Sequence, residues 1–322
     1  RSWSAVSELS SYKIKISASG KISASGKISA SGNGKRGVIM RILELSGETR
    51  KDILSSLLKR SSNNYGQYEE AVGEIVSHVK AEGDKALFAY TKKFDKFDLN
   101  AQNIRVTRAE IDEAYKSLDA DLIEVMKRSA ENIRAFHTRQ LRNSWFDAKE
   151  DGTILGMRMT PIEKAGVYVP GGKAAYPSSV LMNVIPAKVA GVKEIIMTTP
   201  PDADGRIAAG TLIAADIAGV DTIYKAGGAQ AIAAMAFGTE SVPKVDKVTG
   251  PGNIFVALAK KAVYGHVSID SIAGPSEILV LADESANPKY VAADLLSQAE
   301  HDELASAILI TTSKELAKKV SD

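Results

Sequence analysis

At about 100–200 residues per domain, the 322 residues of the chain predict roughly two domains. Charged residues make up 25% of the sequence and hydrophobic residues 44%, which is ordinary for a globular protein and excludes wholesale disorder or a collagen-like fibre. The chain has no cysteine. Disulfide scaffolds, thiolate zinc sites, iron–sulfur clusters and cysteine nucleophiles are therefore excluded.

The charges are nearly balanced, with 41 Lys and Arg against 39 Asp and Glu. This balance argues against the basic footprint of a nucleic-acid-binding protein. No apolar run approaches the ~18 residues that cross a bilayer, and the first residues lack the pattern of a secretory signal. We therefore expect a cytoplasmic protein with no nucleic-acid or membrane partner.

Residues 17–32 repeat a short Ser-Ala-Ser-Gly pattern interrupted by Lys-Ile. Such a repeat has too few apolar side chains to build a core. Residues 1–39 are therefore interpreted as a low-complexity tail or an artificial segment, and they are left out of the fold prediction.

The next section has helical periodicity. Apolar residues recur at helical spacing in 53–58 and 65–80. Asp84 is expected to cap a helix over 86–93, and Thr107 with Glu110 forms a capping-box pattern. Residues 119–146 resemble one long amphipathic helix. Residues 40–147 therefore predict a helical front section.

After Gly152, short β-rich runs alternate with segments of helical length. This alternation predicts βαβ units and a mostly parallel sheet, whose ligands bind at the carboxyl ends of the strands. The predicted helices lie near 177–190, 206–218, 228–237, 252–264 and 287–300. The predicted strands are 154–160, 166–169, 194–198, 222–225, 247–249, 278–281 and 306–311.

Glycine and proline gather in four loops that follow or precede these strands, at 168–173, 226–230, 249–253 and 273–277. Glycine allows a close backbone approach to a ligand, and a helix N-terminus offers free N–H groups to an anion. Each loop alone is better explained as a structural turn. Neither GxGxxG after a strand nor GxxxxGK[ST] is present, so the ordinary dinucleotide and P-loop fingerprints are missing.

Gln298 and His301 are three residues apart near the end of a predicted helix and share a face. The pair is able to hold a divalent metal, but the spacing alone favours a histidine stabilised by the helix dipole, because two ligands do not make a zinc site. The three other histidines, His78, His137 and His266, are interpreted as structural or surface residues.

Taken together, the loops resemble the signatures of histidinol dehydrogenase across residues 40–322. The matching blocks are 166–172 with 177–182, 227–247, 250–253, 273–277 and 294–301, in the family's order. The resemblance implies an α/β fold with Rossmann-like parallel-sheet domains and a helical N-terminal section. It divides the chain into a first domain of 40–167 with 277–322 and an NAD-binding domain of 168–276.

The resemblance also implies an NAD-dependent, zinc-dependent oxidation of L-histidinol to L-histidine through histidinal, in the last steps of histidine biosynthesis. It assigns Tyr168, Gln230 and Asn253 to NAD. It assigns Ser276, Gln298 and His301 to the substrate, and Gln298 and His301 also to one zinc ion per site. The family forms homodimers. Because the chain lacks cysteine, the aldehyde must be hydrated by a water that a general base activates.

The family's Glu-His acid–base pair lies in a Pro-Glu-His-Leu motif downstream of His301, which the resemblance puts beyond Asp322, the last of the 322 residues. We therefore expect a truncated, poorly active form of the enzyme with no catalytic residue in this chain. Two alternatives remain open. One is a related dehydrogenase of another small alcohol, such as a sulfonated diol; the other is a non-catalytic nucleotide-binding or interaction fragment.

Overall fold

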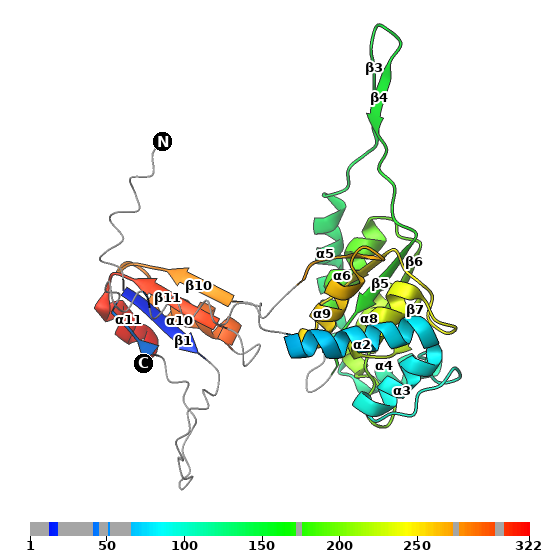
Figure 1. Cartoon of the computed structure of the whole chain (residues 1–322). Helices are drawn as coiled ribbons and strands as arrows, with labels where there is room; N and C mark the ends of the chain where they lie inside the picture. The colour runs from blue at the N-terminus through cyan, green and yellow to red at the C-terminus, as the bar shows by residue number, and fades with distance from the viewer. Residues whose placement is uncertain are drawn as a thin grey trace. The chain divides into compact units, whose positions relative to one another are not determined.

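The computed structural model describes residues 13–18, 41–44, 51, 66–171, 176–272, 277–299 and 306–322 (Figure 1). The helical pattern expected at 53–58 lies outside these residues. The described residues within 65–272 form one compact unit, and those within 1–64 and 273–322 form a second. In the first unit the helical front packs on the parallel sheet, whereas the division expected from the sequence separates them at residue 167. That division stays a prediction.

The first unit is built on a five-stranded parallel sheet in the order β7-β6-β5-β8-β9. The strands are β5 (Lys164–Tyr168), β6 (Glu194–Thr199), β7 (Thr222–Lys225), β8 (Lys247–Thr249) and β9 (Ser268–Ile269). Ile195, Ile196 and Met197 are fully buried in succession, as expected for a strand covered on both faces. The predicted α/β class with a parallel sheet is confirmed.

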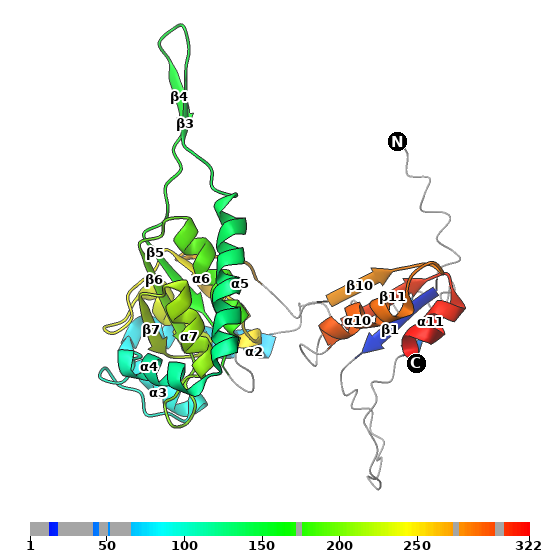
Figure 2. The same ribbon diagram turned by 180° about the vertical axis from the view of Figure 1, so that it is seen from behind.

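Helices cover both faces of this sheet, and Figures 1 and 2 show the two layers from opposite sides. One apolar core lies under the first helical layer and a separate core under the second. The first layer contains α2 (Gly66–Glu82), α3 (Asp84–Asp95), α8 (Gly228–Phe237) and α9 (Ile254–Val263). The second contains α4 (Arg108–Ser117), α5 (Ala120–Thr138), α6 (Pro177–Val189) and α7 (Ala209–Ala218).

The strand order contains a switch point between β5 and β8. From β5 the chain proceeds through β6 to β7 on one side, and β8 and β9 lie on the other side. At such a point the loops leaving two neighbouring strands turn in opposite directions and open a crevice beyond their carboxyl ends. The fold therefore places the loops after β5 and β8 where a ligand is expected to bind.

A hairpin of β3 (Trp145–Ala148) and β4 (Ile154–Met157) projects from this unit (Figure 1). All eight residues of the two strands are exposed, including Phe146 and Ile154. The helix expected over 119–146 is therefore wrong at its end, because α5 stops at Thr138. No glycine or proline marks this stop in the sequence, and the pairing of β3 with β4 decides the structure beyond it.

The second unit has a four-stranded sheet in the order β10-β11-β1-β2. Its elements are β1 (Lys13–Ala18), β2 (Arg41–Ile42), β10 (Glu277–Leu281), α10 (Pro288–Ala299), β11 (Ser306–Thr311) and α11 (Lys314–Ser321). β10 and β11 are parallel, and β1 pairs antiparallel with β11. Residues 13–18 thus join a sheet although they lie in the segment left out of the fold prediction. None of the helices that the structure describes is long and apolar enough to span a membrane.

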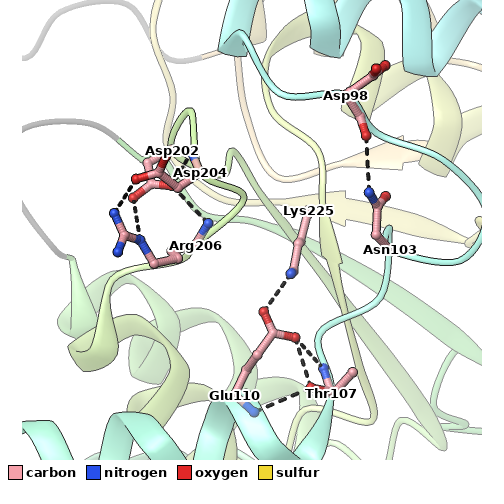
Figure 3. Close-up of polar contacts among 8 residues, drawn as sticks. All are labelled: Asp98, Asn103, Thr107, Glu110, Asp202, Asp204, Arg206 and Lys225. Carbon is pink, nitrogen blue, oxygen red and sulfur yellow. Dashed lines mark hydrogen bonds and ion pairs between the residues drawn. The ribbon is translucent and has the colours of Figure 1, made fainter.

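The capping box predicted at Thr107 is confirmed, and its glutamate also anchors α4 to the sheet (Figure 3). Glu110 Oε2 accepts from the main-chain N–H and the hydroxyl of Thr107 at 2.8 and 3.0 Å. Glu110 Oε1 accepts from Nζ of the buried Lys225 at 2.5 Å. Burial opposes ionisation, but the hydrogen bonds from Lys225 and Thr107 hold the pKa of Glu110 below its usual value.

The cap expected at Asp84 is wrong. The N-cap of α3 is Gly83, and Asp84 is the first residue of the helix. The Asp84 carboxylate instead accepts from the main-chain N–H and the hydroxyl of Ser241, at 3.2 and 2.5 Å. Its own N–H donates to Glu240 Oε2 at 2.8 Å. A contact distant in sequence, which no local pattern reveals, therefore replaces the local cap.

The substitution Glu110→Gln is expected to destabilise the protein by about 1–2 kcal/mol, because Lys225 loses its charged partner. The loss is smaller than for a fully enclosed pair because Glu110 is partly solvated. Since the folded-state pKa is lowered, this stability is present above the unfolded pKa of about 4.3 and is lost as the pH falls through the folded value. Urea unfolding at pH 7 and pH 3 measures both effects.

Glu113→Gln on the same helix is the matched control, since Glu113 forms only an exposed ion pair with Lys116 at 3.6 Å. It is expected to change the unfolding free energy by less than about 1 kcal/mol. Equal losses from the two substitutions at pH 7 would contradict an anchoring role for Glu110.

Candidate functional site

A cavity of about 480 Å³ lies at the carboxyl ends of the parallel strands in the first unit. Part of its lining follows the strands directly: Tyr168 ends β5, Pro200 follows β6, Gly228 follows β7 and Asn253 follows β8. Ile75 of α2, Phe94 and Asp95 of α3 and Phe255 of α9 complete much of the rest. The cavity is thus mainly apolar with a few convergent polar groups, which is the usual character of a small-molecule site.

The hydroxyl of Tyr168 joins the end of β5 to the start of α8. Tyr168 is buried, and its Oη accepts from the main-chain N–H of Gly228 at 3.1 Å. Burial raises the pKa of Tyr168 to about 12, so the phenol keeps its proton at neutral pH. The O–H of Tyr168 is therefore able to donate a hydrogen bond to a ligand in the cavity.

The N-terminus of α8 has no side-chain cap. Gly227 is the N-cap residue, and Gly228 begins the helix with a φ of +63°. Among the described residues, no acceptor is bonded to the main-chain N–H groups of Ala229 and Gln230, and both residues line the cavity. Free N–H groups at a helix N-terminus, aided by the helix dipole, favour an anionic group such as a phosphate.

Two side-chain amides lie at the same cavity. Gln230 is buried, and its Oε1 lies so close to Gly228 that a Cβ added there would stand 2.7 Å away. Asn253 caps α9, with its Oδ1 accepting from the N–H groups of Phe255 and Val256 at 3.1 and 3.2 Å. This cap uses the oxygen of Asn253 and leaves its amide NH₂ able to donate to a ligand.

Gly250, three residues before Asn253, is held on both sides of its main chain. Its N–H donates to Asp270 Oδ2 at 2.9 Å, and its carbonyl accepts from Lys260 Nζ at 3.0 Å. Lys260 is buried and forms an ion pair with Asp270. A Cβ on Gly250 would lie 2.0 Å from the carbonyl oxygen of Tyr168. The absence of a side chain at residue 250 therefore lets the loops after β5 and β8 meet.

The loop after β6 is fixed by its own charges (Figure 3). Asp202 Oδ1 accepts from the N–H groups of Asp204 and Arg206 at 2.9 and 2.8 Å, and the Arg206 guanidinium pairs with both carboxylates. Burial opposes ionisation, but these hydrogen bonds lower the pKa of Asp202. The preceding residues Pro200 and Pro201 line the cavity, so this turn steadies one part of its lining.

The sequence analysis missed Asp95, the last residue of α3. Asp95 lines the cavity, and its Oδ2 is buried without a hydrogen-bond partner. Burial raises the pKa of Asp95 to about 6. No motif signals this residue, because it belongs to an amphipathic helix distant in sequence from the glycine-rich loops. Lys260 and Asp270 were also missed, because each lies outside the glycine- and proline-rich loops that the sequence singles out.

The structure brings together three of the residues singled out in the sequence, since Tyr168, Gln230 and Asn253 line one cavity. Gln298 lies half-buried near the end of α10 in the second unit. Ser276 and His301 lie outside the described residues. No group of three or more His, Cys, Asp or Glu side chains in the described part of the chain is placed to hold a metal ion. The expected roles of all six residues stay predictions.

Asp322, beyond which the resemblance puts the acid–base pair, is the C-cap residue of α11. Its main-chain N–H donates to the carbonyl of Lys318 at 3.1 Å in the second unit. None of these contacts tests the expectation that the general base is absent from residues 1–322. That expectation stays a prediction. It did not consider Asp95, an acid whose Oδ2 is buried.

Comparison with known proteins places these features in a family context. The family described as Histidinol dehydrogenase matches residues 58–322. A histidinol dehydrogenase of Halalkalibacterium halodurans is 61% identical over 253 residues, covering 79% of this chain and 59% of the relative. One of Clostridium acetobutylicum is 56% identical over 282 residues, covering 88% of this chain and 65% of the relative. The chain thus spans less than two thirds of the length of these relatives.

A solved structure gives the same result for the fold. The crystal structure of histidinol dehydrogenase from Elizabethkingia anophelis matches with a TM-score of 0.73 at 44% identity. The match covers 78% of this chain and 58% of that one.

The close contact of Gly250 with Tyr168 generates a stability prediction. Gly250→Ala adds a Cβ against the Tyr168 carbonyl at a φ of +117°, whereas Gly265→Ala adds one at a φ of +98° with no atom within 4 Å. Both substitutions carry the cost of a positive φ, about 1–3 kcal/mol. Only Gly250→Ala adds overpacking, so it is expected to lose about 1–3 kcal/mol more. Urea unfolding of both variants measures the difference, and equal losses would show that the contact yields without cost.

Proposed function

The chain belongs to the histidinol dehydrogenase family, and from that premise we propose that it takes part in the NAD-dependent oxidation of L-histidinol to L-histidine through histidinal. The observation that carries the proposal is the uncapped N-terminus of α8 at a cavity on the switch point of the sheet. This is the place and the chemistry with which open parallel sheets bind dinucleotides.

The residues at the cavity fit NAD. The N–H groups of Ala229 and Gln230 suit its pyrophosphate, and Gly227 and Gly228 place no side chain in the way. The apolar side chains of Ile75, Phe94 and Phe255 suit a planar base. We propose that Tyr168, Gln230 and Asn253 hold the cofactor through the Tyr168 O–H and the two side-chain amides.

NAD, when bound, would supply a two-electron acceptor for hydride, and two NAD molecules in succession would serve the oxidation of the alcohol and that of the hydrated aldehyde. The chain's own residues bind and orient the cofactor. Tyr168 stays protonated and neutral, so it contributes a hydrogen bond and no charge. The apolar part of the cavity removes water from the bound ring, which strengthens each of these polar contacts.

Zinc is also proposed, with Gln298 and His301 as its ligands in this chain and with Ser276, Gln298 and His301 facing the substrate. Gln298 is half-buried on α10, a position compatible with a ligand. An amide oxygen and one imidazole make a weak ligand set that leaves coordination positions for a substrate amine and imidazole. No step is derived through the metal, because Ser276 and His301 lie outside the described residues.

The proposal extends to the setting of the enzyme. As in the family it resembles, the chain is proposed to act in the cytoplasm as a homodimer on a small-molecule substrate. Light scattering of the purified protein measures its mass. A molar mass of one chain at micromolar concentration would contradict the proposed dimer.

The hydroxyl of Tyr168 gives a direct test of the cofactor site. Tyr168→Phe removes one donor to the ligand and leaves the N–H of Gly228 without its acceptor. NAD is expected to bind about 3–10-fold more weakly, the equivalent of one neutral hydrogen bond. Isothermal titration calorimetry with NAD measures the change. Tyr264→Phe, at an exposed tyrosine outside the cavity, is the control and is expected to bind NAD as the unchanged protein does.

A second prediction concerns turnover. A polypeptide of these 322 residues contains no Pro-Glu-His-Leu motif, to which the family resemblance assigns the general base that activates water. A missing general base typically lowers the rate about 10²–10⁴-fold. The reference is the Bacillus subtilis histidinol dehydrogenase, to which this chain is 54% identical. With histidinol, NAD and zinc, the rate of NAD reduction by this chain is expected to be lower than that of the reference by the same factor. Absorbance of NADH at equal enzyme concentration measures the ratio, and equal rates would refute the assignment of the base.

A further inference from the structure

Asp95 is a carboxylic acid placed where it weakens the fold. It is the last residue of α3, at the negative end of the helix dipole, where a carboxylate is repelled. Its Oδ2 is buried with no hydrogen-bond partner. No ion pair or hydrogen bond to the Asp95 side chain is found among the described residues. A buried acceptor without a donor costs stability and calls for an explanation.

The position of Asp95 supplies that explanation. Asp95 lines the cavity together with Tyr168, Gln230 and Asn253. It is also close enough to Tyr168 for its charge to contribute to the raised pKa of the phenol. Among the described residues that line the cavity, Asp95 is the one with a charged side chain. Its missing donor is therefore expected to come from a ligand with hydroxyl or amino hydrogens.

Within the proposed function, we infer that Asp95 accepts hydrogen bonds from the adenosine ribose hydroxyls of NAD and thereby selects NAD over NADP. This inference rests on the proposed cofactor site. A ribose diol offers two O–H donors to one carboxylate, as acidic residues in other dinucleotide sites use. NADP carries a phosphate on the same 2′ oxygen, which removes that donor and brings a negative charge against Asp95.

The cavity lining contains two groups of opposite electrostatic character. The α8 N-terminus offers N–H groups that suit the pyrophosphate, whereas Asp95 comes from α3 and offers an acceptor. A dinucleotide satisfies both groups, because its pyrophosphate is an anion for the N–H groups and its neighbouring ribose hydroxyls are neutral donors for the carboxylate. The acid therefore disfavours an additional phosphate on the ribose, whereas the N–H groups at the start of α8 offset the charge of the pyrophosphate that all such cofactors share.

The test compares Asp95→Asn with Asp98→Asn, which makes the same change in net charge. Asp98 is exposed, and its carboxylate pairs with Lys92 at 3.1 Å outside the cavity (Figure 3 shows Asp98). Calorimetric titration with NAD and with NADP gives the ratio of the two dissociation constants. The unchanged protein and Asp98→Asn are expected to prefer NAD by at least about tenfold. In Asp95→Asn the preference is expected to fall at least about tenfold, because the repulsion is lost.

The outcomes separate this inference from the proposed function. If the unchanged protein binds neither dinucleotide, the cofactor site itself is refuted, and this inference falls with it. If the unchanged protein prefers NAD and Asp95→Asn keeps the same ratio, the role of Asp95 alone is overturned. The inference is also overturned if Asp98→Asn lowers the ratio as much, since the effect would then come from net charge.

Unfolding experiments check that Asp95→Asn folds and that the acid lacks a structural partner. Because the folded-state pKa of Asp95 is raised to about 6, the ionised carboxylate weakens the fold above that pH. Asp95→Asn is therefore expected to have a higher urea midpoint than the unchanged protein at pH 8. The difference is expected to shrink toward pH 4, where the acid is protonated. A lower midpoint at pH 8 would reveal a structural partner and overturn the inference.

Discussion

Gly250 approaches the main chain of Tyr168 more closely than any residue with a side chain is able to. That approach joins the loop after β8 to the end of β5. These are the two neighbouring strands between which the strand order reverses. The Tyr168 hydroxyl accepts a hydrogen bond from the N–H of Gly228. Asn253, three residues after Gly250, caps the N-terminus of α9. Asp270 holds the N–H of Gly250 and the buried Lys260 holds its carbonyl, so the site depends on a fixed main chain.

Two helix termini at the cavity leave polar groups without a partner among the described residues. At Thr107, Asp119 and Asn253, side chains complete the N-termini of α4, α5 and α9. The start of α8 lacks such a cap, and the end of α3 carries an acid that opposes its dipole. The starts of α6 and α7 also lack a side-chain cap, but the start of α8 and the end of α3 lie at one cavity, although these two helices are more than a hundred residues apart. Natural sequences depart from local rules mainly at functional sites.

The parallel sheet was predictable because its signals are local. The strand at 247–249 was predicted at the bounds it has in the structure, since a short run ends there at a glycine-containing loop. The end of α5 was not predictable, because tertiary pairing with β4 overrides the helical periodicity. The site divides in the same way. Glycine-rich loops and the family resemblance point to Tyr168, Gln230 and Asn253. Asp95 has no motif, because a sequence pattern does not report which buried carboxylate lacks a partner.

The hairpin of β3 and β4 is expected to unfold locally, before the rest of the first unit. Its two strands pair only with each other, and their side chains are exposed rather than packed on either core. An isolated two-stranded ribbon is marginally stable in water. The ribbon therefore opens locally, at a free energy far below that of global unfolding. Its amide hydrogens then exchange with solvent through this local opening. Those of β6, a buried strand in the interior of the sheet, exchange only when the whole unit unfolds.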